Sequence, residues 1–248
     1  MTAPRTTVVA VDGPSGVGKS TVGRRIAAHL GLPYLDTGAM YRAVGLKVKR
    51  AGIALPVDGD GGPRAAAVAA IAEGADVRVT EESRTLLDGE DVSAEIRSPE
   101  ISLYASAVSA VPAVRRRLAA IQRRLALEGG GVLEGRDIGT KVVPETPHKL
   151  FLDAPAEIRA RRRHAELAAR GSAEAFEKVL AEMVARDLAD ETRADSPLTC
   201  NATYRRIDTS GLDVDGVVAA CLAAIATPAV AGGATTEPQE ERDRPTQG

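Results

Sequence analysis

Short apolar runs rich in β-branched residues alternate with longer segments of helical periodicity along most of this chain. Residues 7–11, Thr-Val-Val-Ala-Val, have the continuous apolar pattern of a buried parallel strand. Val22, Ile26 and Leu30 follow at helical spacing, and Gly31 stands where a helix would end. This alternation predicts an α/β fold, with a parallel sheet flanked by helices. The same patterns predict strands at 34–35, 132–133, 150–152 and 204–208, and helices at 39–51, 64–73, 101–127 (a second helix starting at Pro112), 155–170, 173–189 and 214–225.

One segment departs from the alternation. Residues 77–80 and 85–89 have the pattern of a small antiparallel hairpin that turns around 81–84. Because the hairpin interrupts a βα sequence, we expect an insert of about residues 64–100, which follows a loop at Asp58–Pro63.

The two ends of the chain lack apolar periodicity. Residues 1–6 are expected to form a flexible start. Residues 227–248 consist largely of Pro, Gly, Thr, Gln and charged residues, which predicts a disordered tail. A single domain over residues 7–226 remains.

Composition narrows the functional classes. The 248 residues carry a net charge of −2, which gives no field that favours nucleic acid or an anionic membrane. Six aromatic residues, none of them Trp, argue against a protein that stacks single-stranded bases. No apolar run reaches the roughly 18 residues of a membrane span, and no signal-peptide pattern occurs at the start. Cys200 and Cys221 lack metal or redox spacing, so we expect reduced thiols in a cytoplasmic protein. The sequence has no extended apolar face that would require a partner, so we expect a monomer.

The segment after the first strand fits the P-loop pattern G-x-x-x-x-G-K-[ST]. Its glycines let successive backbone N–H groups point at a phosphate. Lys19 would supply a positive charge to the β- and γ-phosphates, and the Ser20 hydroxyl can bind Mg²⁺. The alternative is a chance glycine-rich turn, which the flanking strand and helix disfavour. The expected ATP-binding residues are Gly13, Pro14, Ser15, Gly16, Val17, Gly18, Lys19, Ser20 and Thr21.

Two polar stretches follow predicted strands and should face the same edge of the sheet. Residues 35–42 would direct Arg42 toward an anion, although a helix start capped by Thr37 explains this stretch as well. Residues 132–140 deliver Glu134, Arg136 and Asp137. An ion pair between Arg136 and Asp137 is the structural alternative, but adjacent residues pair poorly and flanking glycines favour a ligand.

A third polar stretch covers residues 186–198 and follows the charged segment of Arg159, Arg162 and Arg163. Arg186 and Asp190 lie one helical turn apart. An arginine-bearing segment above a P-loop suits phosphoryl transfer, which needs positive charge and exclusion of water. A solvated charged helix face explains the pattern equally well, and the residues leave both interpretations open.

These motifs together resemble those of the bacterial cytidylate kinases. The similarity includes the P-loop, residues 36–42, Gly-Glu-Asp-Val-Ser at 89–93 with Glu-Ile-Arg at 95–97, and residues 134–140, and it runs in order from about 7 to 225. It implies the P-loop nucleoside monophosphate kinase fold: a parallel sheet flanked by helices, a small antiparallel β insert that enlarges the monophosphate-binding region, and a short helical lid at about 159–193. It also implies transfer of the γ-phosphate of ATP, with Mg²⁺, to CMP or dCMP.

The resemblance also implies roles for individual residues. Arg42 would bind the CMP phosphate, with Thr37 where many members have Ser. Ser106 and Arg115 would read cytosine together with Asp137. Glu134 stands where some members have Asp, which keeps the charge and adds a methylene. The implied catalytic residues are Lys19, Arg136, Arg186 and Arg193, and the implied CMP-binding residues are Thr37, Arg42, Ser106, Arg115, Arg136, Asp137, Asp190 and Arg193.

Other functions remain as alternatives. A P-loop kinase could act on another small acceptor, such as UMP or shikimate. A GTPase-type switch is disfavoured because the guanine-reading Asn-Lys-x-Asp motif is missing: Asn201 is the single asparagine, and Ala202 follows it. Arginine runs at 115–117 and 161–163 suggest a nucleic-acid-binding module, which the net charge and the few aromatic residues oppose.

Overall fold

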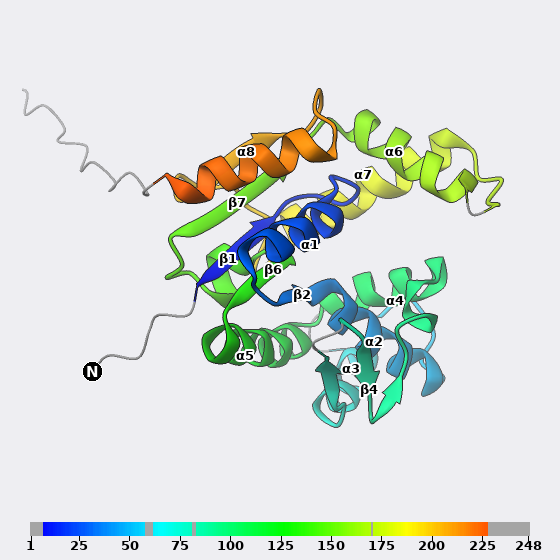
Figure 1. Ribbon diagram of the computed structural model, residues 1–248. Coiled ribbons are helices and arrows are strands. Elements are labelled where there is room, and N and C mark those ends of the chain that lie inside the picture. Colours follow the sequence, from blue (N-terminus) through cyan, green and yellow to red (C-terminus); the bar gives the residue numbers. More distant parts are fainter. Residues whose placement is uncertain (1–6, 58–61, 81–82, 170, 228–248) are drawn as a thin grey trace, which may run out of the picture.

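The computed structural model describes residues 7–57, 62–80, 83–169 and 171–227. Its central feature is a five-stranded parallel sheet with the strand order β2-β6-β1-β7-β8 (Figure 1). The flexible start expected for 1–6, most of the loop at 58–63, part of the hairpin turn and the tail beyond Thr227 lie outside these residues. The strands are β1 (Val8–Asp12), β2 (Tyr34–Asp36), β6 (Gly131–Gly135), β7 (His148–Asp153) and β8 (Arg205–Asp208). The predicted parallel α/β sheet is therefore confirmed.

Strand β1 lies at the centre of the sheet and is buried over its whole length. Its side chains alternate between two hydrophobic clusters, as a strand covered on both faces requires. Val9 and Val11 pack into one cluster, whereas Val8 and Ala10 pack into the other. The carboxyl ends of β1, β2 and β6 therefore meet at one edge, where Asp12 pairs in register with Gly135 and Asp36 with Glu134.

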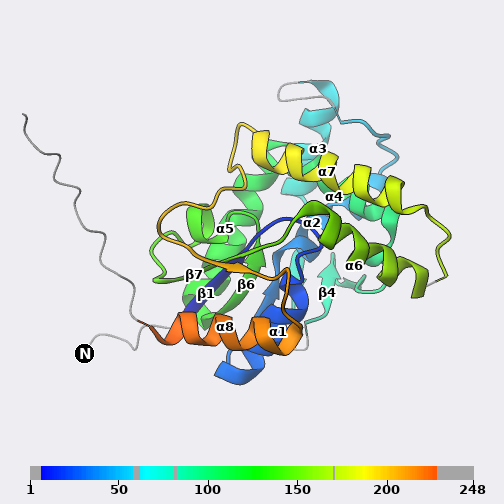
Figure 2. The same cartoon turned by 90° about the horizontal axis from the view of Figure 1, so that it is seen from above.

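Helices cover both faces of this sheet. Two of them, α1 (Lys19–Leu30) and α8 (Val214–Ala226), lie side by side on one face (Figure 2). On the other face, α2 (Thr37–Arg50) packs against β6, and α3 (Pro63–Glu73), α4 (Pro99–Ser109) and α5 (Pro112–Gly129) pack against α2 in the same hydrophobic cluster. Helices α2 and α4 approach each other closely, and a Cβ added to Gly45 would meet the Ala105 nitrogen at 2.9 Å.

Several helices begin earlier than their apolar pattern predicts, because capping residues determine their starts. Asp36 caps α2 by accepting the Ala39 N–H, so Thr37 is the first helical residue and not the cap. Ser98 caps α4, with Pro99 at the first helical position. Polar cap residues and proline contribute nothing to hydrophobic periodicity, so the periodicity located only the interiors of these helices.

The predicted hairpin is part of a three-stranded antiparallel sheet. Strands β3 (Val77–Val79) and β4 (Thr85–Leu87) occupy the expected segments, and β5 (Glu90–Asp91) pairs with β4 as a third strand. Sequence analysis missed β5 because it consists of two exposed acidic residues. A short 3₁₀ helix, η1 (Glu95–Arg97), follows it.

Two further helices, α6 (Ala156–Ala169) and α7 (Phe176–Thr192), extend beyond the sheet edge that carries the P-loop (Figure 1). Helix α7 continues three residues past its predicted end, so Asp190 is a helical residue. A single π-helical turn, η2 (Ile138–Val142), follows β6 and packs against β1 and α5. This segment was not predicted as helical.

Gly13 has a backbone requirement that a stability measurement can test. Its φ is +149°, and an added Cβ would lie 2.2 Å from the Leu152 carbonyl oxygen. We expect Gly13→Ala to lower the free energy of unfolding by about 3–5 kcal/mol, since both the conformation and the backbone contact forbid a side chain. Gly31→Ala is the matched control: Gly31 has φ +64° with no atom near the added Cβ, so only about 1 kcal/mol should be lost. Urea unfolding without nucleotide compares the two, and equal losses would contradict the steric explanation.

Candidate active site

The P-loop lies at the carboxyl end of β1, as its motif predicts. Gly16 and Gly18 adopt positive φ angles of 72° and 96°, which curl the backbone ahead of α1. The Lys19 ammonium donates to the carbonyl oxygens of Gly13 at 2.7 Å and Pro14 at 2.6 Å. Burial, and then the nearby Arg136 guanidinium, lower the pKa of Lys19 well below its ordinary value. The loop therefore holds a buried ammonium group at the first residue of α1, where the helix N-terminus adds to the positive field that a phosphate requires.

Ser20 and Glu134 form an oxygen-rich pair next to this loop. The Ser20 hydroxyl donates to Glu134 Oε1 at 2.7 Å. Glu134 Oε2 is buried and has no hydrogen-bond partner within the described parts of the chain. Burial raises the pKa of Glu134, and the like charge of Asp36, its register partner on β2, raises it further. The carboxyl group thus holds the Ser20 hydroxyl through one oxygen, and the Tyr34 hydroxyl lies close to it.

The Arg136 side chain forms an ion pair with helix α7. Its Nε donates to Asp190 Oδ2 at 2.8 Å, and Arg193 Nη1 donates to Asp190 Oδ1 at 3.1 Å. Burial would raise the pKa of Asp190, but the two arginines more than offset this and lower it. The alternative of an Arg136–Asp137 ion pair is wrong, because each of these residues pairs with a distant partner. The structure therefore brings three of the expected residues together, from helix α7 and from the positions just after β6 and α7.

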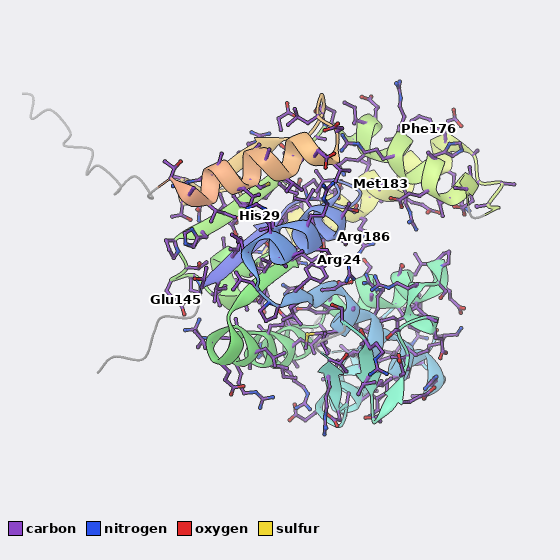
Figure 3. The ribbon with its side chains drawn as sticks, in the orientation of Figure 1. Arg24, His29, Glu145, Phe176, Met183 and Arg186 are labelled. Atoms are coloured by element: carbon purple, nitrogen blue, oxygen red, sulfur yellow. The ribbon has the colours of Figure 1, made fainter. Side chains whose placement is uncertain are left out.

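Arg186 lies on the next turn of α7 after Met183 (Figure 3). Burial and then the charge of Arg136 lower its pKa to about 10, while Asp190 opposes this and Arg42 adds further repulsion. Among the described side chains, no hydrogen bond or ion pair of Arg186 is found. The guanidinium groups of Arg42 and Arg136 therefore repel that of Arg186. Such a concentration of positive charge favours the binding of an anion.

Asp36 organises the phosphate-facing end of α2. Its Oδ2 accepts from Arg42 at 2.8 Å and from Arg97 at 3.1 Å, while Oδ1 accepts the Ala39 N–H. Burial opposes ionisation, yet the two arginines lower the pKa of Asp36. Thr37, which the sequence suggested as a cap, instead donates its hydroxyl to the Glu134 carbonyl oxygen at 2.6 Å. The roles of Asp36 and Arg97 were missed, although Arg97 belongs to the Glu-Ile-Arg motif.

Arg115 and Asp137 form a buried ion pair at 2.5 Å. Arg115 also lies over the ring of Tyr41, 5.6 Å from its centroid, and its Nε is buried with no partner among the residues described. Burial raises the pKa of Tyr41 to about 12. Arg115 donates weakly to the Ser109 carbonyl, and the predicted Ser106 lies one helical turn before Ser109, whose hydroxyl donates to the Ser106 carbonyl. Sequence analysis missed Tyr41, although it lies in the stretch at residues 35–42.

A second buried ion pair fastens α6 and α7 to the P-loop. Asp187 Oδ1 accepts the Ser15 N–H at 3.2 Å and its hydroxyl at 3.1 Å, and Arg159 donates to Asp187 Oδ2 at 2.5 Å. Arg159 also donates to the Ser15 and Ala154 carbonyl oxygens. The buried face of α7 contains Asp187 and Asp190, so a solvated charged face does not describe this helix.

Two further expectations concern other parts of the chain. Cys200 is exposed, Cys221 is buried, and both are free thiols. Within the described ranges, every helix is too short or too polar to cross a membrane.

Comparison with known proteins identifies the family. The model of the cytidylate kinase family matches residues 9–227. Cytidylate kinases of Pelotomaculum thermopropionicum and Mycobacterium leprae are each 50% identical to this chain, over 85% and 86% of its length and 92% of theirs. A gluconokinase structure from Sinorhizobium meliloti covers 90% of this chain and 94% of its own at 17% identity, with a TM-score of 0.45. The family match spans the P-loop and every charged pair described above, and with these two relatives it shows that the chain belongs to the cytidylate kinase family.

Proposed function

We propose that this protein transfers the γ-phosphate of ATP to CMP or dCMP and releases ADP with CDP or dCDP. The observation that carries the proposal is the position of the Arg115–Asp137 pair. The pair is buried, Asp137 lies just past the carboxyl end of β6 beside β1 and the P-loop, and the charges of both residues act on the nearby Arg193. We assign the monophosphate side to α2–α5 with the small sheet, and the lid to α6 and α7.

The proposed reaction requires positioning and charge neutralisation more than covalent chemistry. A nucleoside monophosphate already carries an ionised oxygen, so no strong general base is needed. Lys19 would neutralise the transferred phosphoryl group, and Arg136 would reach both phosphates. Arg42 and Arg186 would hold the acceptor phosphate, with Arg193 beside them. The carboxylates of Asp36 and Asp190 already orient Arg42, Arg136 and Arg193, so little reorganisation is needed during transfer.

Base selection follows from the chemistry of Arg115 and Asp137. The Asp137 carboxylate accepts hydrogen bonds, which suits the exocyclic amine of cytosine, and the unpaired Arg115 Nε can donate to a ring nitrogen or carbonyl. Uracil would place a carbonyl oxygen opposite the carboxylate. The unpaired oxygens would then be costly in a buried site.

The residues present fit a Mg²⁺ ion that arrives with ATP. Mg²⁺ prefers oxygen ligands and usually binds through one or two protein oxygens together with substrate phosphates and water. Ser20 Oγ and the unpartnered Glu134 Oε2 are such oxygens. The ion would neutralise charge on the β- and γ-phosphates. Ser20 Oγ and Glu134 Oε2 would hold it, while Glu134 Oε1 would orient the Ser20 hydroxyl.

The proposed function predicts a marked preference among acceptors. With ATP and Mg²⁺ held constant, ADP release should be measured with CMP, dCMP, UMP, AMP and shikimate. We expect kcat/KM for CMP or dCMP to exceed that for UMP by about 10²-fold or more, because uracil leaves buried polar groups unpaired. Equal kcat/KM values for UMP and CMP would contradict the role of Asp137, and turnover with shikimate alone would overturn the function.

A second prediction concerns Lys19. We expect Lys19→Ala to lower kcat by about 10²–10³-fold, since it removes a preorganised charge from the transferred phosphoryl group. Lys149→Ala is a matched control, because Lys149 is equally buried and also donates to a backbone carbonyl, that of Pro144. The control should lose comparable stability and retain kcat within about threefold. Steady-state kinetics and thermal unfolding test this, and unchanged turnover in Lys19→Ala would refute the assigned role.

A third prediction concerns the pH dependence created by Glu134. Its pKa is raised in the folded state by burial, so its stabilising contribution is complete below the unfolded value of 4.5 and is lost as pH rises through the folded pKa. Glu134→Gln keeps an acceptor for Ser20 and removes the charge. We therefore expect the variant to gain unfolding free energy relative to wild type as the pH rises from about 5 to about 8 without nucleotide, because the wild-type carboxyl group must then ionise in a buried site. Its kcat at saturating Mg²⁺ should fall.

Urea unfolding across this pH range, with Glu145→Gln as an exposed control, measures the effect. Glu145 lies at the surface beside Arg123, and its pKa is lowered by that arginine. The control should therefore show no gain in stability with rising pH. If Glu134→Gln instead lost stability relative to wild type as pH rises, the folded state would not raise the pKa of Glu134, and the prediction would fail.

A further inference from the structure

Asp12 is a fully buried carboxylate that the proposed chemistry does not use. It is the last residue of β1, its exposed fraction is 0%, and Gly13 of the P-loop follows it directly. Its two oxygens accept three hydrogen bonds, from the Ile138 N–H at 3.0 Å, the Gly139 N–H at 2.9 Å and the Tyr204 hydroxyl at 2.7 Å. In the described part of the chain no cation forms an ion pair with it. Burial raises the pKa of this carboxyl group, and the three donors offset part of the cost of burying it.

The two amides bonded to Asp12 directly follow Asp137, the carboxylate that binds Arg115. The Asp12 backbone is itself fixed, since it pairs in register with Gly135 on β6 and Phe151 on β7. A rigid strand therefore holds the carboxylate, and the carboxylate holds the start of η2 at two separate points, Oδ1 and Oδ2. Two bonds to adjacent amides determine the orientation of the segment as well as its distance from β1.

We propose that Asp12 is a positioning residue that fixes Asp137 relative to the strand before the P-loop, and so supports base selection. This inference rests on the proposed function of Asp137 and Arg115. Asp12 contacts neither nucleotide in this scheme, because its oxygens are occupied by Ile138, Gly139 and Tyr204. It acts through the backbone that carries Asp137.

Steric contacts at Gly139 support the same conclusion. A Cβ added there would lie 2.8 Å from the Tyr204 hydroxyl oxygen and 3.0 Å from Lys149 Cγ and Cδ. The amide of Gly139 can reach Asp12 because residue 139 carries no side chain. Tyr204 is held in turn by edge-on packing against Phe151, with ring centroids 5.9 Å apart. The segment after Asp137 is therefore confined between Asp12 and Tyr204.

The first test is Asp12→Asn. The asparagine keeps one acceptor oxygen, but its amide nitrogen must face a backbone N–H, so one buried donor loses its partner. We expect KM for CMP to rise about tenfold and the CMP-to-UMP ratio of kcat/KM to fall by a similar factor. KM for ATP should change less than about twofold, because strand pairing keeps the P-loop backbone in place.

Thr146→Val is the matched control for a purely structural effect. Thr146 is buried at the opposite end of β1, and its hydroxyl donates to the Val8 carbonyl oxygen. This variant also removes a buried hydrogen bond from the same strand, far from the P-loop. It should lower the unfolding midpoint while both KM values and the CMP-to-UMP ratio stay at the wild-type level.

A second pair of variants tests the inference without altering Asp12, and remains informative if Asp12→Asn does not fold. Gly139→Ala should raise KM for CMP with little effect on KM for ATP, because the methyl group displaces the amide from Asp12. Tyr204→Phe should have a smaller effect, since both amide bonds remain. Combining Gly139→Ala with Tyr204→Phe removes the closest steric contact and should restore KM for CMP toward wild type.

The outcomes separate the inference from the function on which it rests. Wild-type enzyme that fails to prefer CMP over UMP contradicts the proposed function. Wild-type preference for CMP, combined with Asp12→Asn or Gly139→Ala variants that lose stability but keep both KM values and the base preference, overturns the role of Asp12. Equal increases in KM for CMP and ATP would also overturn it, since Asp12 would then support the whole sheet edge.

Discussion

The site depends on the neutralisation of buried and partly buried arginines by carboxylates at the carboxyl edge of the parallel sheet. Arg42, Arg115 and Arg136 each have a carboxylate partner that is less than a tenth exposed. An unpaired arginine would be costly to bury, and arginines close together would repel one another. The carboxylates remove part of this cost and hold each planar guanidinium group in one orientation. The protein can therefore place several positive charges near two phosphorylated substrates while this edge of the sheet stays folded.

The parts of the site that could be predicted from sequence are those in which neighbouring residues act together. The P-loop contains its glycines, Lys19 and Ser20 within nine consecutive residues, and the apolar strand before it places them at a sheet edge. The partners of the charged residues could not be predicted in this way. Arg136 pairs with Asp190 across 54 residues, and Ser15 bonds Asp187 across 172. Contacts between residues so far apart in the sequence are determined by tertiary packing, which local periodicity does not predict.

The sequence also did not reveal which polar side chains hold the backbone in place. Asp36 was treated as a residue of the motif, yet its Oδ1 caps α2 while its Oδ2 holds two arginines. Asp12 was not singled out at all, because a single acidic residue at the end of an apolar strand has no distinctive spacing. Three donors from η2 and from the residue before β8 converge on it only after the chain has folded. Residues of this kind connect different secondary-structure elements. They are therefore identified by their hydrogen bonds in the folded protein and not by a sequence pattern.

Helix α7 explains why its charged stretch was ambiguous from sequence. Its buried face begins with Val179 and Met183 and continues at helical spacing with Asp187 and Asp190. Leu188, by contrast, is 59% exposed. Hydrophobic periodicity alone would turn the second half of this helix outward, because it treats charge as a mark of solvent. The charged half faces inward because Ser15, Arg159 and Arg136 provide partners for its carboxylates. The same helix is thus held by apolar packing at one end and by ion pairs where it reaches the P-loop.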